Sequence, residues 1–212
     1  MTPLAVDHVI LATADIHATA TRLERDHGLV SLPGGRHAGH GTGNRIVPLG
    51  DSYIEIMGIV DEDEAAASPM GAWLREQTAD GDRVAALCLR TDASGLDATA
   101  ERLGLRPLPM SRDAPGGITL SWRLAGLAEA MANPSRTFFI DWQVPPDLHP
   151  ARGDARHRVR PTGFAWVELA GGADAIRAWL GEDVPGVRVV AAPGPSVRAT
   201  VALAGGGEVR LD

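Results

Sequence analysis

The chain has 212 residues and a formal net charge of −7, and 44% of its residues are hydrophobic. All 20 of its basic residues are arginine, which excludes lysine Schiff bases and the lysine of a P-loop. The negative charge argues against nucleic acid as a partner, because phosphates require a basic surface. No apolar run approaches the roughly 18 residues that cross a bilayer, and the N-terminus lacks a signal-peptide pattern, so we expect no membrane contact and a cytoplasmic location.

The first predicted unit covers residues 1–60. It begins with a strand that places His8 on one face, and Asp15 then caps a helix that ends at Gly28. A glycine-rich segment is predicted as a loop that leads into two strands. We expect the first strand at residues 4–13, the helix at 16–26 and the loop at 33–44. The two following strands are expected at 45–49 and 52–60.

Residues 61–82 are predicted to form a connecting helix. Four consecutive acidic residues from Asp61 to Glu64 open an amphipathic pattern that continues through Leu74. Acidic side chains are favoured at a helix start by the helix dipole, so these four are interpreted as a solvated first turn.

The same order recurs in a second unit at residues 83–145. Its helix, with the letters ATAERL, echoes the ATATRL of the first helix, which indicates an internal duplication. A linker rich in proline and arginine is expected at 146–162, where His149 and His157 are predicted to be solvated. A third, smaller unit of the same order is predicted at 163–212.

The strand Ser52–Ile59 carries one carboxylate, Glu55, among apolar and aromatic residues. An ionised carboxylate is costly to bury alone, so Glu55 must be protonated, paired, exposed or bound to a metal. His8 raises the same question in the first strand. We therefore hypothesise that His8 and Glu55 face one cavity and share a metal ion.

The repeated βαβββ units, the opening DHVIL with His8 and the YIEI with Glu55 resemble the vicinal oxygen chelate superfamily. Over most of residues 4–150, the segments PGGRHAGHGTGNRIVPLGDSYIEIMGI, LSWRLAG and FFIDWQVPPDLHP resemble its glyoxalase-like domain proteins. The resemblance implies an α+β fold in which the units form a half-open barrel around a divalent metal. It also implies a small-molecule ligand in that barrel.

Carried onto this sequence, the resemblance gives His8, Glu55 and Asp141 as metal ligands, with Glu55 as the catalytic proton carrier. Asp141 in FIDW matches Glu55 in YIEI. The fourth ligand position is filled by Ala86, which aligns with His8 when Leu11 is aligned with Leu89, and alanine cannot bind a metal. Each candidate also has a plain structural interpretation: a backbone hydrogen bond for His8, and an arginine partner for Glu55 and for Asp141.

The glycine-rich loop and one strand of the second unit supply candidate ligand-binding residues. Glycines allow close approach of a ligand, and imidazoles can carry protons near neutral pH. His37 or His40 is thus a candidate proton carrier or missing metal ligand, and simple exposure is the alternative for both. The predicted substrate-binding residues are Arg36, His37, His40, Asn44, Ser121 and Arg123.

Three functional hypotheses follow. The first is a metal-dependent enzyme of isomerase, lyase or dioxygenase type, with Zn, Mn, Fe, Co or Ni as its metal. The second, suggested by Ala86, is a metal-free protein that sequesters a small molecule, as bleomycin-resistance proteins of the superfamily do. The third is a subunit of a homodimer in which residues 163–212 pack against a second copy.

Overall fold

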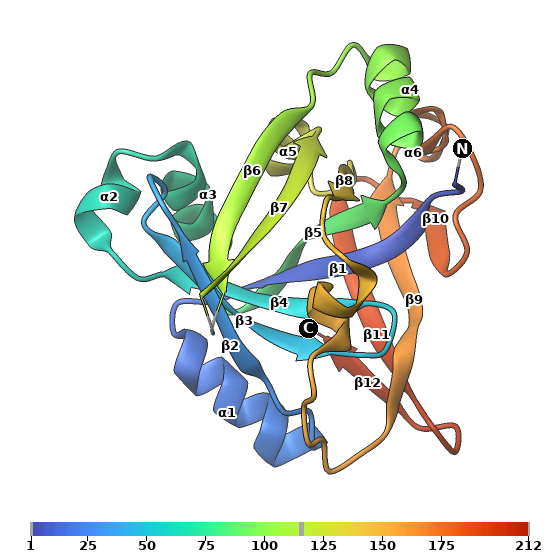
Figure 1. Ribbon diagram of the computed structural model, residues 1–212. Coiled ribbons are helices and arrows are strands. Elements are labelled where there is room, and N and C mark those ends of the chain that lie inside the picture. Colours follow the sequence, from blue (N-terminus) through green and yellow to red (C-terminus); the bar gives the residue numbers. More distant parts are fainter. Residues whose placement is uncertain (1, 115–116, 212) are drawn as a thin grey trace.

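The computed structural model describes residues 2–114 and 117–211 and has a mixed α+β fold (Figure 1). The first unit begins with a strand and a helix, which are followed by three strands. These five elements are β1 (Ala5–Ala12), α1 (Ile16–His27), β2 (Leu32–His37), β3 (Thr42–Pro48) and β4 (Tyr53–Ile59). Asp15 caps α1 by accepting two backbone N–H bonds, and Gly28 ends it in the left-handed conformation, as the sequence predicts.

The second unit repeats this order and adds a short helix before its last strand. Its elements are β5 (Arg83–Arg90), α4 (Ala93–Leu103), β6 (Leu108–Ala114), β7 (Ile118–Ala125), α5 (Leu127–Ala132) and β8 (Phe138–Trp142). Helix α4 is capped by Asp92 and ends at Gly104, so that it begins with an aspartate cap and ends with a glycine, as α1 does. Strand β6 and helix α5 were not predicted from the sequence.

The strands of both units form one eight-stranded sheet in the order β2-β3-β4-β1-β5-β8-β7-β6. At its centre β1 and β5 run antiparallel, and each pairs in parallel with the last strand of its own unit. The edge strands β2 and β6 come into contact, so the sheet is curled into a nearly closed barrel. The predicted fold class is thus confirmed, and units one and two together form the barrel.

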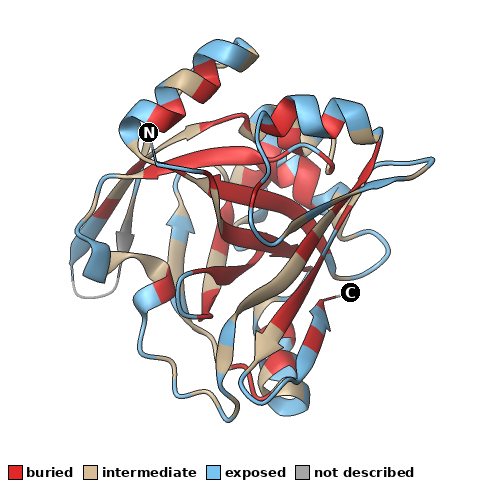
Figure 2. Ribbon diagram, turned by 90° about the vertical axis from the view of Figure 1, so that its right-hand side faces the viewer, coloured by how far each residue is buried: buried red, intermediate tan, exposed pale blue. Residues whose placement is uncertain are grey.

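The two sides of this sheet bury different sets of residues because side chains alternate along each strand. Val9, Leu11 and Leu87 point outward into a large core shared with α1 and α4. Ile10, Met57 and Phe138 point into the barrel. Figure 2 shows that the central strands are buried along most of their length. The candidate site therefore lies inside the barrel and the main core lies outside it.

The third unit forms a separate four-stranded sheet in the order β10-β9-β11-β12. Its elements are β9 (Pro161–Gly171), α6 (Ala173–Leu180), β10 (Val187–Ala191), β11 (Ser196–Leu203) and β12 (Glu208–Leu211). Strand β9 pairs in parallel with the second strand of its unit, whereas β1 and β5 pair with the last strand of theirs. The element order therefore repeats, but the topology differs.

The apolar face of unit three packs on the outer side of the barrel (Figure 1). Val167 and Leu169 of β9 and Trp179 of α6 join the core that includes Leu87 and Phe139. The indole N–H of Trp179 also donates to the backbone carbonyl of Thr137, at 3.0 Å. This apolar face is therefore buried within the chain itself.

The sequence-based boundaries fail in two places. The segment predicted as a loop at 33–44 contains β2, because the backbones of Leu32 and Arg36 pair with β3 although the sequence has little strand propensity. The helix predicted from Asp61 through Leu74 is two helices, α2 (Glu62–Ala66) and α3 (Pro69–Gln77). The break falls at Ser68 and Pro69, since a serine cap followed by proline starts a new helix.

The linker is also more ordered than predicted, with two 3₁₀ turns at Pro146–Leu148 and Pro150–Arg152. His157 accepts a hydrogen bond from the backbone N–H of Val30 and contacts the carbonyl of Pro48, at 2.9 and 2.8 Å. The imidazole thus ties the linker to the first unit and is not solvated. Among the described residues, no helix is long and apolar enough to cross a membrane.

Candidate functional site

The barrel encloses a cavity of about 610 Å³, counting the part open to solvent. One wall is apolar and aromatic, and Trp122, Leu124, Phe138 and Ile140 of the second unit contribute to it. Most of the polar side chains lie on the first unit, among them His8, His37, His40, Asn44 and Glu55, and the second unit adds Arg112. The two units therefore provide chemically different walls of one cavity.

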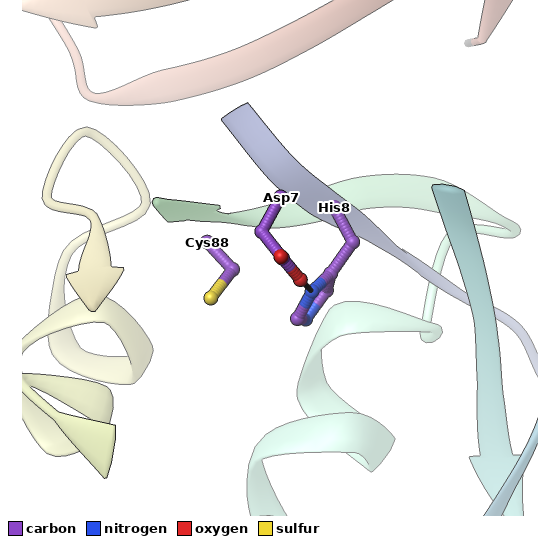
Figure 3. A group of neighbouring side chains, drawn as sticks. All are labelled: Asp7, His8 and Cys88. Carbon is purple, nitrogen blue, oxygen red and sulfur yellow. Dashed lines mark hydrogen bonds and ion pairs between the residues drawn. The ribbon is translucent and has the colours of Figure 1, made fainter. Parts of the chain in front are cut away.

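His8 belongs to the polar wall, and Asp7 lies behind it, outside the cavity lining. The register of β1 against β5 shifts between Val6 and His8, which marks a bulge at Asp7. A bulge lets consecutive side chains reach the same side of a sheet. The Asp7 carboxylate consequently contacts His8 Nδ1, with Oδ1 at 2.7 Å (Figure 3). Both residues are buried, with exposed fractions of 0% and 3%.

The charge of this pair is stabilised by its neighbours. Burial alone would raise the pKa of Asp7, but hydrogen bonds from His149 and His8 hold that pKa well below its usual value. Burial likewise opposes a charged His8, yet interactions with the ionised Asp7 and Glu55 raise the pKa of His8 well above 6.5. The buried pair is therefore an aspartate anion and an imidazolium cation in the absence of a ligand.

Glu55 of β4 faces the other side of the His8 ring. Its Oε2 lies 3.3 Å from His8 Nε2, and its Oε1 accepts a hydrogen bond from the Asn44 amide at 2.5 Å. Burial alone would raise the pKa of Glu55, but His8, His37 and Asn44 lower it to about 2. The carboxylate is therefore ionised, and its partners are His8 and Asn44 where the sequence suggested an arginine.

His37 of β2 is the second imidazole next to Glu55. Its Nδ1 lies 2.9 Å from the Thr42 hydroxyl, which itself donates to Met70 Sδ at 3.5 Å. The imidazole thus donates from Nδ1, and the lone pair of Nε2 accepts from the Asn44 amide at 3.4 Å, with Glu55 Oε1 at 3.6 Å. Burial lowers the pKa of His37, so that this ring is neutral near pH 7. His40 lines the same cavity and contacts Ser68 Oγ at 3.2 Å.

The second unit offers no equivalent ligands. The backbone N–H of Thr13 donates to the carbonyl of Met57, and in the second unit Thr91 donates to Ile140 in the same way. Met57 and Ile140 are therefore equivalent positions. Two residues earlier in each strand, Phe138 is the counterpart of Glu55. Alanine at Ala86 faces Ile10 across the β1–β5 pair and is buried. Both positions are thus filled by apolar side chains.

Four predicted site residues do not reach the cavity. Asp141 alternates with the cavity residue Ile140 and therefore points outward, where it binds Arg123 at 3.0 Å. Arg123 also contacts Asp97 of α4, and Ser121 lies on the same outward face. Arg36 is half-exposed and paired with Asp61 and Glu64. None of these four residues lines the cavity, so none of them is part of the site described here.

Sequence analysis also missed residues that shape the site. Asp7 was passed over because regular alternation places it opposite His8, and a bulge has no signal in the letters. His149 was expected to be solvated, but its Nε2 donates to Asp7 Oδ2 at 2.9 Å. Arg112 lines the cavity from the unpredicted strand β6. Arg112 is two residues after Met110, so the two side chains share a face of the strand, and this spacing is the only sequence signal that places Arg112 in the cavity.

Two βαβββ units that pair through their first strands and enclose a polar cluster define a protein of the vicinal oxygen chelate class. The family model of the glyoxalase-like domain matches residues 6–184, and the chain belongs to this family. No curated protein matches the chain.

Solved structures show the same fold. A hypothetical protein from Staphylococcus aureus is 14% identical, with 99% of each chain covered and a TM-score of 0.70. The methylmalonyl-CoA epimerase of Mycobacterium tuberculosis is 18% identical over 68% of this chain and 90% of its own, with a TM-score of 0.48. At 14% identity the likeness to the first of these structures concerns the fold alone, and it extends over unit three.

Proposed function

We propose that this chain is a divalent-metal-dependent enzyme that acts on a small oxygen-bearing organic molecule in the barrel, by isomerase, lyase or dioxygenase chemistry. The observation that carries the proposal is the approach of two imidazoles to one carboxylate. His8 Nε2 lies 3.3 Å from Glu55 Oε2, and His37 Nε2 lies 3.6 Å from Glu55 Oε1. Membership of the glyoxalase-like family supports this assignment.

The donor types of these three residues suit a divalent metal. Two imidazoles and a carboxylate are a donor set that suits Zn, Mn, Fe, Co or Ni and leaves positions for water or substrate oxygens. The other ring nitrogens are held by Asp7 and Thr42, which orients Nε2 of His8 and of His37 as the ligand atoms. His37 thus takes the role for which the sequence suggested it as a missing ligand.

A competing group is formed by Asp7, His8 and Cys88, whose ligand atoms lie within 4.8 Å of one another among the described residues (Figure 3). It is a poorer metal site. Burial raises the pKa of the Cys88 thiol to about 12, so that no thiolate is available near neutral pH. Both Asp7 oxygens already accept hydrogen bonds, from His8, His149 and Trp142. Asp7 is better placed to orient His8.

The protein's own groups then divide the remaining work. A divalent metal, when bound, polarises a substrate carbonyl or stabilises negative charge on its oxygen. Glu55 is the proposed proton carrier, because its carboxylate is ionised and lines the cavity, so that it is able to accept a proton there. The apolar wall of Trp122 and Phe138 binds the hydrocarbon part of the substrate and excludes water.

Metal analysis of protein purified without chelator tests the proposal. We expect about one equivalent of metal, and a loss of it in His8→Ala and in Glu55→Ala. The matched control is Asp141→Asn, which alters a buried carboxylate on the outer face and should leave the metal content unchanged. A content below about 0.1 equivalent that is the same in His8→Ala would overturn the proposal.

The second candidate function is metal-free binding of a small molecule. The observation that favours it is that Glu55 already has an ion pair with His8 and a hydrogen bond from Asn44, while Ala86 and Phe138 add no ligands. Thermal-shift screening in EDTA separates the two functions. Compounds that stabilise the protein equally with and without EDTA support sequestration, and stabilisation that requires added metal supports the enzyme.

A further inference from the structure

Arg112 lies in a place where an arginine is costly. It extends from β6 into the wall of the barrel cavity, whose other residues on this side are apolar, such as Met110 and Leu124. Its Nη1 is buried and has no hydrogen-bond partner among the residues that the structure describes. A buried donor without a partner costs more than a satisfied one contributes, and more so when it carries charge.

The surroundings of Arg112 show where a partner would come from. The residue lines the barrel cavity and also a surface groove that runs past Ile118 and His149, close to the contact between β2 and β6. His37 of β2 and Tyr53 of β4 line the same cavity, and β2 contacts β6, which places Arg112 near the polar end of the cavity. An anion that enters at this contact between the two edge strands therefore meets Arg112 next to the cluster around Glu55.

We infer that Arg112 anchors the carboxylate of the cavity's ligand, and that this ligand is a monocarboxylic acid with an aromatic or other apolar body. A guanidinium suits a carboxylate because its N–H groups form paired, charge-assisted hydrogen bonds. One arginine beside the ionised Glu55 favours a single negative charge over a dianion such as a phosphate monoester. Trp122, Trp142 and Phe138 provide the apolar wall for the body of the ligand.

This inference deepens the proposed function, since it names the substrate class of the same cavity. It does not depend on the metal, because Arg112 is not among the three proposed metal ligands. The two can therefore fail separately: loss of metal binding tests His8, Glu55 and His37, whereas a preference for carboxylates in the presence of EDTA tests Arg112.

The experiment compares acids with their neutral isosteres. Benzoate and phenylacetate are titrated against benzamide and phenylacetamide by calorimetry, in EDTA and again with added Mn²⁺. We expect the wild-type protein to bind at least one acid about 10-fold or more tightly than its amide, as one charge-assisted contact implies. The preference should disappear in Arg112→Gln and be retained in Arg112→Lys, which keeps the charge. Arg106→Gln removes an exposed arginine at the start of the same hairpin and is the matched control.

Several results would overturn the inference. The first is that no acid binds more tightly than its amide to the wild-type protein, which includes the case in which no probe binds. The second is an acid preference that persists in Arg112→Gln or is lost equally in Arg106→Gln. A preference seen only with Mn²⁺ and kept in Arg112→Gln would assign the carboxylate to the metal instead. Should Arg112→Gln not fold, Arg112→Lys and the wild-type comparison still decide the question.

Discussion

Asp7 and His8 are adjacent in the sequence, yet the Asp7 carboxylate lies 2.7 Å from His8 Nδ1. The contact is possible because β1 has a bulge at Asp7, where its pairing with β5 shifts in register. This contact sets the tautomer of the ring, since Nδ1 donates to Asp7 and Nε2 is presented to Glu55. A carboxylate behind a histidine is the arrangement that orients metal-binding imidazoles in proteins.

Replacing Asp7 by asparagine should therefore weaken metal binding without removing a proposed ligand. We expect metal affinity to fall about 10- to 100-fold, the usual effect of losing such an orienting carboxylate. The pKa of His8 should also fall, because its buried anionic neighbour is lost. Metal titration and NMR titration of the His8 ring measure the two effects. Unchanged affinity in Asp7→Asn, relative to Asp141→Asn as control, would contradict the proposed role.

Stability should depend on pH through Glu55 and His8. The pKa of Glu55 is about 2 in the folded protein and 4.5 ordinarily, so its contribution is complete above pH 4.5 and is lost as the pH falls toward 2. The pKa of His8 is raised above 6.5, so its contribution is complete below pH 6.5 and is lost as the pH rises through the raised value. Together they predict greatest stability between about pH 4.5 and 6.5.

Thermal unfolding from pH 2 to 10 in the presence of a chelator measures this profile. In Glu55→Gln the loss of stability at acid pH should be smaller, because no carboxylate is left to protonate there. Asp7 remains and contributes in the same direction, since its folded pKa is also lowered. If stability falls equally steeply at acid pH in Glu55→Gln and in the wild-type protein, then Glu55 is not paired in the folded state.

Gly34→Ala should disturb the site from a distance. A Cβ at Gly34 would lie 1.8 Å from Asn44 Oδ1 and 2.7 Å from the Asn44 carbonyl, so that Asn44 has to move. Asn44 accepts a hydrogen bond from the Gly35 N–H and donates one to Glu55, and its displacement breaks both. We expect a destabilisation of about 1–3 kcal/mol and weaker ligand or metal binding. Gly194→Ala, where an added Cβ meets nothing within 4 Å, is the control and should change neither property.

Unit three should unfold together with the barrel. Leu169 of β9 has an exposed fraction of 0% and lies in the core that contains Leu87 of β5. Leu169→Ala should therefore lower the free energy of unfolding by about 2–5 kcal/mol, in a single transition seen both by circular dichroism and by hydrogen exchange of β5 amides. Val190→Ala in the same sheet removes a half-exposed side chain and should cost much less. Two separate transitions would show that the units are independent.

At Asp141 the sequence pattern and the strand register disagree. Its letters repeat the pattern around Glu55, but backbone pairing makes Phe138 the counterpart of Glu55 and turns Asp141 outward to Arg123. The helices α1 and α4 align well by their letters because both are defined by local caps, Asp15 and Asp92, and by a final glycine. Strand register has no such local marker, and one residue of slip reverses the face of a side chain.

The sequence by itself determined the repeated βαβββ order and the family resemblance, and it led to the hypothesis that His8 and Glu55 face one cavity, because these follow from hydrophobic periodicity, caps and the cost of burying a charge. Only the tertiary structure decided that Asp7 turns toward His8, that Asp141 turns away and that Arg112 enters the cavity from β6. Those outcomes depend on a bulge, on strand register and on the approach of two edge strands. Each is fixed by contacts between residues far apart in the chain and leaves no local pattern in the letters.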